Sequence, residues 1–407
     1  MKIYKKTLFI IIIVMVLFVE LIFWGTVPFL KYADEVTAII SIISLAVWSL
    51  CHKGKIEKEY RKILLVISIV VVFGFVGNIL NGVTRSYFAA AVDCLGTIKV
   101  FVSVIFVYTY LNGAEAKQTV ALLCKPAKIF LWMAVFFGVV SIFTDIGMGG
   151  EVRYGLRAYS FVFGHAHILA ITSISALAII ASNEITQKKL YLYTILACLC
   201  QLLTTKGPSI VWSIIIFFMF RYYMHNRKIK LWLIILIATV GILAGGYQIT
   251  NYFMNASAPR AILLKYGIET ARRYFPWGAG FATYGSDMAK VYYSKLYYEY
   301  GFNNIGGMGE YDGMYLNDNY WPMAMGQFGF IGALFLLYAF YSLFHNVQKK
   351  CSDRRVRAIM ITNVVYILAH SLGSASLTSM EGTFLFVIFG VVLALYKNDS
   401  FCFSRKV

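Results

Sequence analysis

Apolar runs long enough to cross a lipid bilayer recur along the chain, and they constrain its fold more than any other feature. The protein is 60% hydrophobic and only 14% charged, whereas about a quarter of the residues in a soluble domain are charged. Inside a bilayer only helices and closed barrels satisfy their backbone polar groups, and about 20 apolar residues make one spanning helix. We therefore expect an all-α integral membrane protein with twelve spans. They cover residues 7–27, 34–50, 63–80, 87–111, 128–144, 161–181, 190–204, 209–220, 231–249, 327–344, 358–375 and 382–396.

The basic residues are unevenly distributed between the connections. The net charge is +18, but most Lys and Arg residues lie in alternate short connections and in the two tails. Because short cytoplasmic connections are enriched in Lys and Arg, this pattern places both termini in the cytoplasm and predicts an even number of spans. The basic residues then face anionic membrane lipids, and we expect no nucleic-acid partner. The basic segments are 2–6, 53–62, 117–128, 188–189, 221–230, 349–357 and 397–406.

One connection is much longer than the others and divides the chain into three parts. Residues 1–250 contain the first spans, residues 251–326 form a large extracytoplasmic loop, and residues 327–407 contain the last spans and a cytoplasmic tail. The loop is rich in tyrosine and poor in Ser, Gln and Pro, so we expect it to be folded. We expect helices at 260–274 and 288–300. The tyrosines of the second helix share one face, which is either an aromatic belt at the lipid head groups or a platform for sugar rings.

Basic residues also occur on the expected outer side, where they are normally scarce. Guanidinium groups suit the oxygens of phosphate, so these residues predict a site for a polyanion or a pyrophosphate. For any one of them, a solvated or head-group-bound side chain is the alternative. They lie before the sixth span, in the tight hairpin after the seventh and in the large loop: Arg153, Arg157, Lys206, Arg260, Arg272 and Arg273.

An Asn-Asp-Asn triplet precedes the tenth span. Asn317, Asp318 and Asn319 come just before Trp321 and Pro322, which mark an interface anchor and a helix start. The triplet is either a helix cap or a set of groups that bind sugar hydroxyls, with Asp318 accepting a proton from one of them. Both interpretations stay open from the residues alone.

The histidines and the intramembrane charges are further candidates. His165 and His167 lie at the outer end of the sixth span, and two-residue spacing on a helix points them about 200° apart. They are therefore not expected to share a metal ion, and we take His165 as a substrate-binding candidate. No HExxH motif and no CxxC pair occurs, so we expect no metal and no other cofactor. Ionisable residues inside spans are costly and usually face an interior cavity; here they are Glu20, Asp93, Lys99 and His370.

Several short motifs follow the order of a known family. Arg260 precedes a helix and then the segment Pro276-Trp277-Gly278-Ala279-Gly280, and Asp318-Asn319-Tyr320 precedes Gly329-Phe330-Ile331-Gly332. Thr205-Lys206-Gly207 matches a Ser-Arg-Gly hairpin, and Arg153 to Gly164 fits an Arg-x10-Gly motif. With its many spans and one large loop before the last few, the chain resembles the O-antigen polymerase and ligase superfamily of bacterial membrane glycosyltransferases, which includes the Wzy-type polymerases.

The resemblance implies a metal-independent polymerase of O-antigen, capsule or exopolysaccharide. An acceptor hydroxyl would displace lipid diphosphate from an undecaprenyl-diphosphate-linked oligosaccharide at the outer face of the plasma membrane. Asp318 and Arg273 would be catalytic, and a flippase and a chain-length regulator would be protein partners. Ligases of the superfamily have a catalytic histidine at the place of Asp318, and the large loop contains no histidine, which favours a polymerase. The alternatives are a ligase-type transferase and a non-enzymatic flippase of lipid-linked oligosaccharides.

Overall fold

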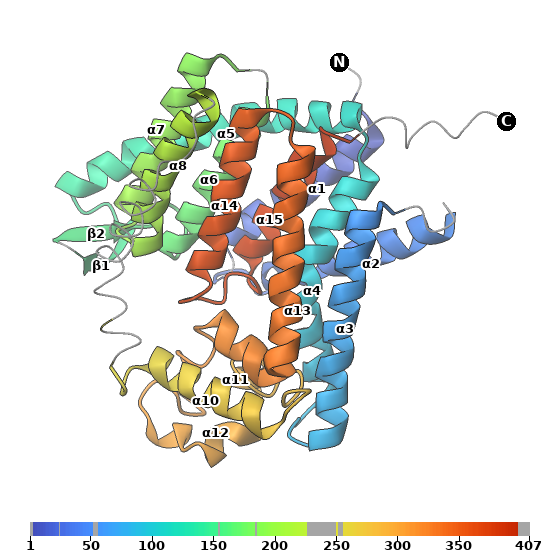
Figure 1. Ribbon diagram of the computed structural model, residues 1–407. Coiled ribbons are helices and arrows are strands. Elements are labelled where there is room, and N and C mark those ends of the chain that lie inside the picture. The colour runs from blue at the N-terminus through green and yellow to red at the C-terminus, as the bar shows by residue number, and fades with distance from the viewer. Residues whose placement is uncertain are drawn as a thin grey trace.

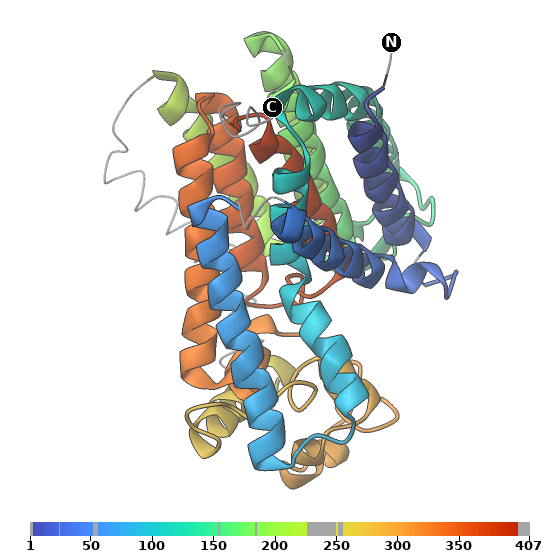
Figure 2. The same cartoon turned by 90° about the vertical axis from the view of Figure 1, so that its right-hand side faces the viewer.

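The chain folds into a bundle of helices with a smaller helical unit at one end (Figures 1 and 2). The computed structural model describes residues 3–397 except 24, 52–55, 154, 184, 226–249 and 251–254. The elements, in chain order, are α1 (Lys5–Phe23), η1 (Leu30–Tyr32), α2 (Ala33–Cys51), α3 (Lys58–Asn81), α4 (Tyr87–Tyr110), α5 (Gly113–Phe143), β1 (Gly149–Arg153), β2 (Leu156–Tyr159), α6 (Ala166–Ser182), α7 (Gln187–Leu203), α8 (Gly207–His225), α10 (Pro259–Arg273), α11 (Asp287–Val291), α12 (Lys295–Glu299), η3 (Phe302–Asn304), α13 (Tyr320–Lys350), α14 (Arg354–His370) and α15 (Met380–Ala394). The two strands pair antiparallel as a hairpin.

Six helical segments of the described chain are long and apolar enough to cross a membrane, judged by length and composition. They are α1, Leu30–Cys51, α3, α4, α5 and α13. Large apolar side chains such as Leu8, Ile12 and Phe136 are exposed on the outside of the bundle, where a lipid bilayer would cover them. Every predicted span except 231–249 overlaps a described helix, and 231–249 lies outside the described residues. The expected all-α chain with membrane-spanning helices fits this arrangement.

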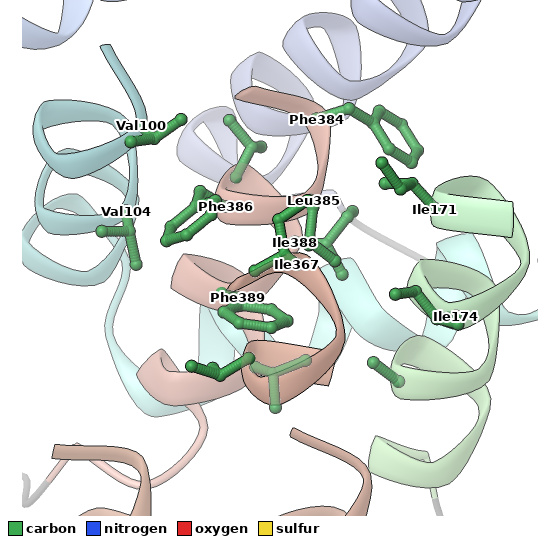
Figure 3. Close-up of a cluster of buried hydrophobic side chains, with 14 of the residues drawn as sticks. Val100, Val104, Ile171, Ile174, Ile367, Phe384, Leu385, Phe386, Ile388 and Phe389 are labelled. Carbon is green, nitrogen blue, oxygen red and sulfur yellow. The ribbon is translucent and has the colours of Figure 1, made fainter. Parts of the chain in front are cut away.

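Helix α15 is the centre of the bundle. Its residues are buried from Glu381 to Ala394, and it packs against α4, α6, α1 and α5. Figure 3 shows side chains of α15 pointing both toward α4 and toward α6. A Cβ added at Gly390 would lie 2.7 Å from Cβ of Val107, so the glycine permits the close approach of α4. This surrounded position explains why α15 is apolar on all sides.

Residues 255–319 form the smaller unit, here called the cap. Figures 1 and 2 show α10, α11 and α12 together at one end of the molecule, beside the last turns of α3. The cap has a hydrophobic core of its own, which includes Ile262, Tyr284, Tyr297, Phe302 and Leu316. The described residues of this segment are thus folded around a core, whereas their place outside the membrane stays a prediction.

The prediction of one helix at 288–300 is wrong in detail. Two short helices, α11 and α12, replace the single helix predicted at 288–300, because Tyr293 has a φ of 39° and Ser294 caps a new helix by accepting from the backbone N–H of Leu296. Tyr293 and Tyr297 are buried in the cap core. Both readings of the tyrosine face, a head-group belt and a sugar platform, are therefore wrong for these two residues.

The segment from Pro276 to Gly280 joins the cap to a break in α13. The break is at Gly329, which has a φ of 65° inside the helix. The N–H groups of Ala279 and Gly280 donate to the carbonyls of Gly326 and Gln327 at 2.9 Å each. Two motifs that the sequence shows far apart thus meet at one backbone junction, and the predicted span start at 327 falls at this break.

Buried charges also fix the bundle and the cap. Lys99 of α4 forms ion pairs with Asp34 and Glu35 at the start of α2, the second at 3.3 Å. The carboxylate of Asp93 accepts from Ser286 Oγ at 2.8 Å and from Gln327 Nε2 at 2.7 Å. These two intramembrane candidates have direct structural roles, because each ties α4 to a segment remote in sequence.

Candidate functional site

Three of the predicted cations meet where the cap faces the bundle. Lys206 lies in the turn between α7 and α8, Arg153 at the end of β1, and Arg260 in the first turn of α10. Burial, and then the positive charges of Arg153 and Arg260, lower the pKa of Lys206 to about 8. Both positive charges therefore act on Lys206, which places the three cations within electrostatic reach of one another. Residues more than a hundred positions apart therefore form one cationic cluster, here called the Lys206 cluster.

Acidic residues border the Lys206 cluster. The Asp318 carboxylate lies 3.5 Å from Nη2 of Arg260, and the Glu151 carboxylate lies 2.5 Å from Nη2 of Arg153. The Glu151 side chain is 76% exposed, and an exposed ion pair contributes only about 0–1 kcal/mol. A phosphate group can therefore take its place on Arg153 at little cost.

The Asn-Asp-Asn triplet does not act as a side-chain cap of α13. Asn319 precedes the helix without a capping hydrogen bond from its side chain, and its Nδ2 donates instead to the carbonyl of Arg260 at 3.5 Å. Burial raises the pKa of Asp318, and the charges of Arg260, Lys206 and Lys290 oppose this shift. Asn317 donates to Asp287 at the start of α11. The triplet thus holds the start of α13 against α10 and directs Asp318 toward the Lys206 cluster.

A row of histidines lies on the bundle side of the Lys206 cluster. The rings of His165 and His167 stack at 5.4 Å, and the ring of His370 lies 5.8 Å from that of His167. The expected 200° separation of His165 and His167 is wrong, because His165 has an extended backbone before the first turn of α6. Nε2 of His167 lies 3.5 Å from the buried carboxylate of Glu381. In the described part of the chain, no three His, Cys, Asp or Glu side chains are placed to hold a metal ion.

Two of the other predicted cations have an acidic partner of their own. Arg157 pairs with Asp145 at 2.7 Å. Arg272 and Arg273 end α10, about 20 Å from Arg260 at a rise of ~1.5 Å per residue. Arg273 pairs with Glu299 at 2.5 Å, and both side chains are nearly half exposed. The sequence groups Arg272 and Arg273 with Arg260, but the length of the helix separates them.

Sequence reasoning missed Glu381 and Lys290, and it left His167 without a role. Glu381 is an acid in the first turn of an otherwise apolar helix, and this is the same signal that identified Asp93. Lys290 lies in α11 and acts on Asp318 through its charge. Its part in the site depends on the fold of the cap, which no local pattern reveals.

A comparison of the chain with protein-family models and with curated proteins gave no match.

Proposed function

We propose that the protein is a membrane glycosyltransferase that uses a lipid-diphosphate-linked oligosaccharide as donor. Its product would be a polysaccharide of the cell envelope, made from undecaprenyl-diphosphate-linked repeat units. The observation that carries this proposal is the Lys206 cluster, in which Arg153, Lys206 and Arg260 converge from separate segments. Three cations held close together suit a ligand with several phosphate oxygens.

The chemistry needs few groups beyond these cations. The donor sugar is already activated, because its anomeric carbon is bonded to a diphosphate oxygen. As that bond breaks, negative charge grows on the leaving diphosphate, where preorganised cations are most effective. Asp318 lies beside Arg260, and we propose that it orients the acceptor sugar through a hydrogen bond from one of its hydroxyls. Arg273, which the resemblance implied as catalytic, has no part in this site because α10 holds it away from Arg260.

The membrane arrangement is part of the proposal. Lys6 and Lys397 donate to the carbonyls of Tyr110 and Thr109 at the C-terminal end of α4, both at 2.9 Å. The cap instead binds Asp93, about 24 Å back along the same helix. The cap and the two terminal segments therefore lie toward opposite ends of α4. This supports a topology in which the termini and the cap lie on opposite sides of the membrane. We propose twelve spans in the plasma membrane, with both termini cytoplasmic and the cap outside.

The flippase alternative has less support from the described residues. A transporter would need charged groups lining a central path. The buried charges Lys99, Asp34 and Glu35 bind one another, and Asp93 is bound by groups of the cap and of α13. The ligase alternative shares the donor chemistry and differs in its acceptor. Only the absence of histidine from the loop sequence argues against it.

Binding of lipid diphosphate to the purified full chain in nanodiscs tests the proposal. We expect undecaprenyl diphosphate to bind, undecaprenol not to bind, and Lys206→Met to lose most of the binding. Arg272→Met is the matched control, because it removes a cation of the cap that lies outside the Lys206 cluster. Equal binding of undecaprenyl diphosphate and undecaprenol would refute the site. Supply of lipid-linked repeat units to the same nanodiscs then separates the functions, since a transferase forms polymer and a flippase does not.

A further inference from the structure

Glu381 and His167 form a pair in which Nε2 of the ring lies 3.5 Å from the carboxylate. The Glu381 carboxylate lies in the first turn of α15 and is 3% exposed, and the His167 ring above it is 22% exposed. His165, which stacks on His167, is exposed. The three side chains thus lead from the surface to a carboxylate inside the bundle.

His370 extends the same row on the other side. Its Nδ1 lies 2.8 Å from Oγ of Ser376 and 2.7 Å from Oγ of Ser374. Both serines belong to the turn between α14 and α15, and Arg260 reaches this turn, since a Cβ at Gly373 would lie 3.9 Å from Nη1 of Arg260. The histidine row and the Lys206 cluster therefore border the same space.

A simpler role for His167 is to neutralise Glu381, because a buried carboxylate needs a partner. Glu381 also acts on Lys206, whose pKa its charge raises, so neutralisation of the carboxylate and a further role for His167 are compatible. A carboxylate behind an imidazole also orients the ring and fixes its tautomer, as it does in hydrolase triads. When Nε2–H donates to Glu381, the lone pair of Nδ1 is left to accept a proton.

We propose that His167 is the proton acceptor for the acceptor hydroxyl and that Glu381 positions the His167 ring. The assignment rests on the proposed glycosyl transfer. A histidine suits this role because a neutral imidazole has one ring nitrogen whose lone pair accepts a proton. Asp318 is less suited, because its carboxylate is paired with Arg260, the residue that we expect to bind the donor diphosphate.

The transfer of the donor sugar to the acceptor hydroxyl needs no further reactant. The acceptor oxygen forms a bond to the anomeric carbon of the donor as the bond from that carbon to the diphosphate oxygen breaks. The electron pair of the broken bond stays on the lipid diphosphate, whose charge the Lys206 cluster stabilises. The hydroxyl proton moves to Nδ1 of His167 and then to water, with His165 at the exposed end of the row.

The first test needs no catalytic activity. The full chain contains six histidines, so ¹⁵N-histidine labelling in nanodiscs gives few signals, and loss of a signal in His167→Gln assigns it. We expect the Nε2-protonated tautomer for His167 at pH 8 and a mixture of tautomers in Glu381→Gln. A His167 ring protonated at Nδ1 in the wild-type protein would overturn the proposal, and this result does not depend on whether Glu381→Gln folds.

The second test is the pH profile of polymer formation. The groups that act on His167 are Glu381 from α15, His370 from α14, His165 before α6 and Lys206 from the α7–α8 turn. We expect His167→Gln to lower kcat by about 10²- to 10⁴-fold, to abolish the acidic limb of the profile and to leave binding of undecaprenyl diphosphate unchanged.

The Asp318→Asn variant separates the two candidate bases, His167 and Asp318. It should retain the acidic limb of the pH profile. Normal lipid binding together with normal turnover in His167→Gln would overturn the assignment of His167 alone. Failure of the wild-type chain to bind undecaprenyl diphosphate would instead overturn the proposed function, whatever tautomer His167 shows.

Discussion

The charge of Lys206 should make lipid-diphosphate binding depend on pH. Burial and the neighbouring Arg153 and Arg260 lower the pKa of Lys206 from 10.5 to about 8. The ammonium group is therefore largely charged at pH 7 and loses its proton as pH rises through about 8. If only the charged form binds the diphosphate, the dissociation constant should increase about tenfold between pH 7 and pH 9.

The same shift predicts the opposite trend for stability. Because the folded pKa lies below the unfolded value, the unfolded chain binds more protons between about pH 8 and pH 10.5, and Lys206 favours folding more as pH rises through that window. Weaker binding at pH 9 is therefore not expected to reflect unfolding through Lys206. A thermal unfolding curve at each pH provides the check.

The assay is a titration of the chain in nanodiscs with undecaprenyl-diphosphate-linked N-acetylglucosamine, whose diphosphate does not titrate in this range. Lys206→Arg is the matched variant, because a guanidinium keeps its charge throughout. We expect a steep loss of affinity with pH for the wild-type chain and a flat profile for Lys206→Arg. A flat wild-type profile, or an equal slope in both proteins, would refute the argument that Lys206 carries the phosphate-binding charge.

Three further predictions test the placement of residues. Arg260→Ala should weaken binding of the same lipid about tenfold or more, since a hydrogen bond to a charged group contributes about 1.5–3 kcal/mol, whereas Arg273→Ala should leave the dissociation constant unchanged. Gly278→Ala should lower the unfolding temperature, because its φ is 78° and a Cβ would lie 2.4 Å from the carbonyl oxygen of Gln327, whereas Gly306→Ala, with nothing within 4 Å, should not. A reporter inserted at Lys290 should read as extracytoplasmic, and a cytoplasmic signal there would refute the proposed topology.

The membrane helices could be predicted because a membrane span requires about 20 mostly apolar residues in a row. The length and composition of such a run can be read directly from one sequence. The ends of the helices were harder to predict. Helix α13 begins at Tyr320, seven residues before the predicted span at 327, because its first turns pack against α10 of the cap. The two short helices around Tyr293 depend on a positive φ, and no residue pattern in that segment requires one.

The candidate site could be predicted only in part, for a geometrical reason. Arginine and lysine on the expected outer side are visible in the sequence, and three of them do converge. Arg272 and Arg273 are of the same residue type as Arg260 and lie on the same helix. Only the length of α10 excludes them from the Lys206 cluster. The stacking of His165 on His167 escaped prediction because helical spacing was applied to a residue that precedes the helix.

Asp93, which is buried, and Lys206, which is half-buried, show how the structure separates a structural charge from a functional one. Asp93 accepts hydrogen bonds from the N–H of Ala282 at 2.6 Å, from Ser286 and from Gln327, so its charge is satisfied within the chain and a ligand has nothing to add. Lys206 instead faces Arg153 and Arg260, whose charges oppose its own, while Glu151 and Glu381 only partly offset them. A bound diphosphate would reverse that balance and raise the pKa of Lys206, so binding above pH 8 should be accompanied by proton uptake. Calorimetric titrations in two buffers of different ionisation enthalpy measure this uptake directly, and its absence at pH 8.5 would place the phosphate away from Lys206.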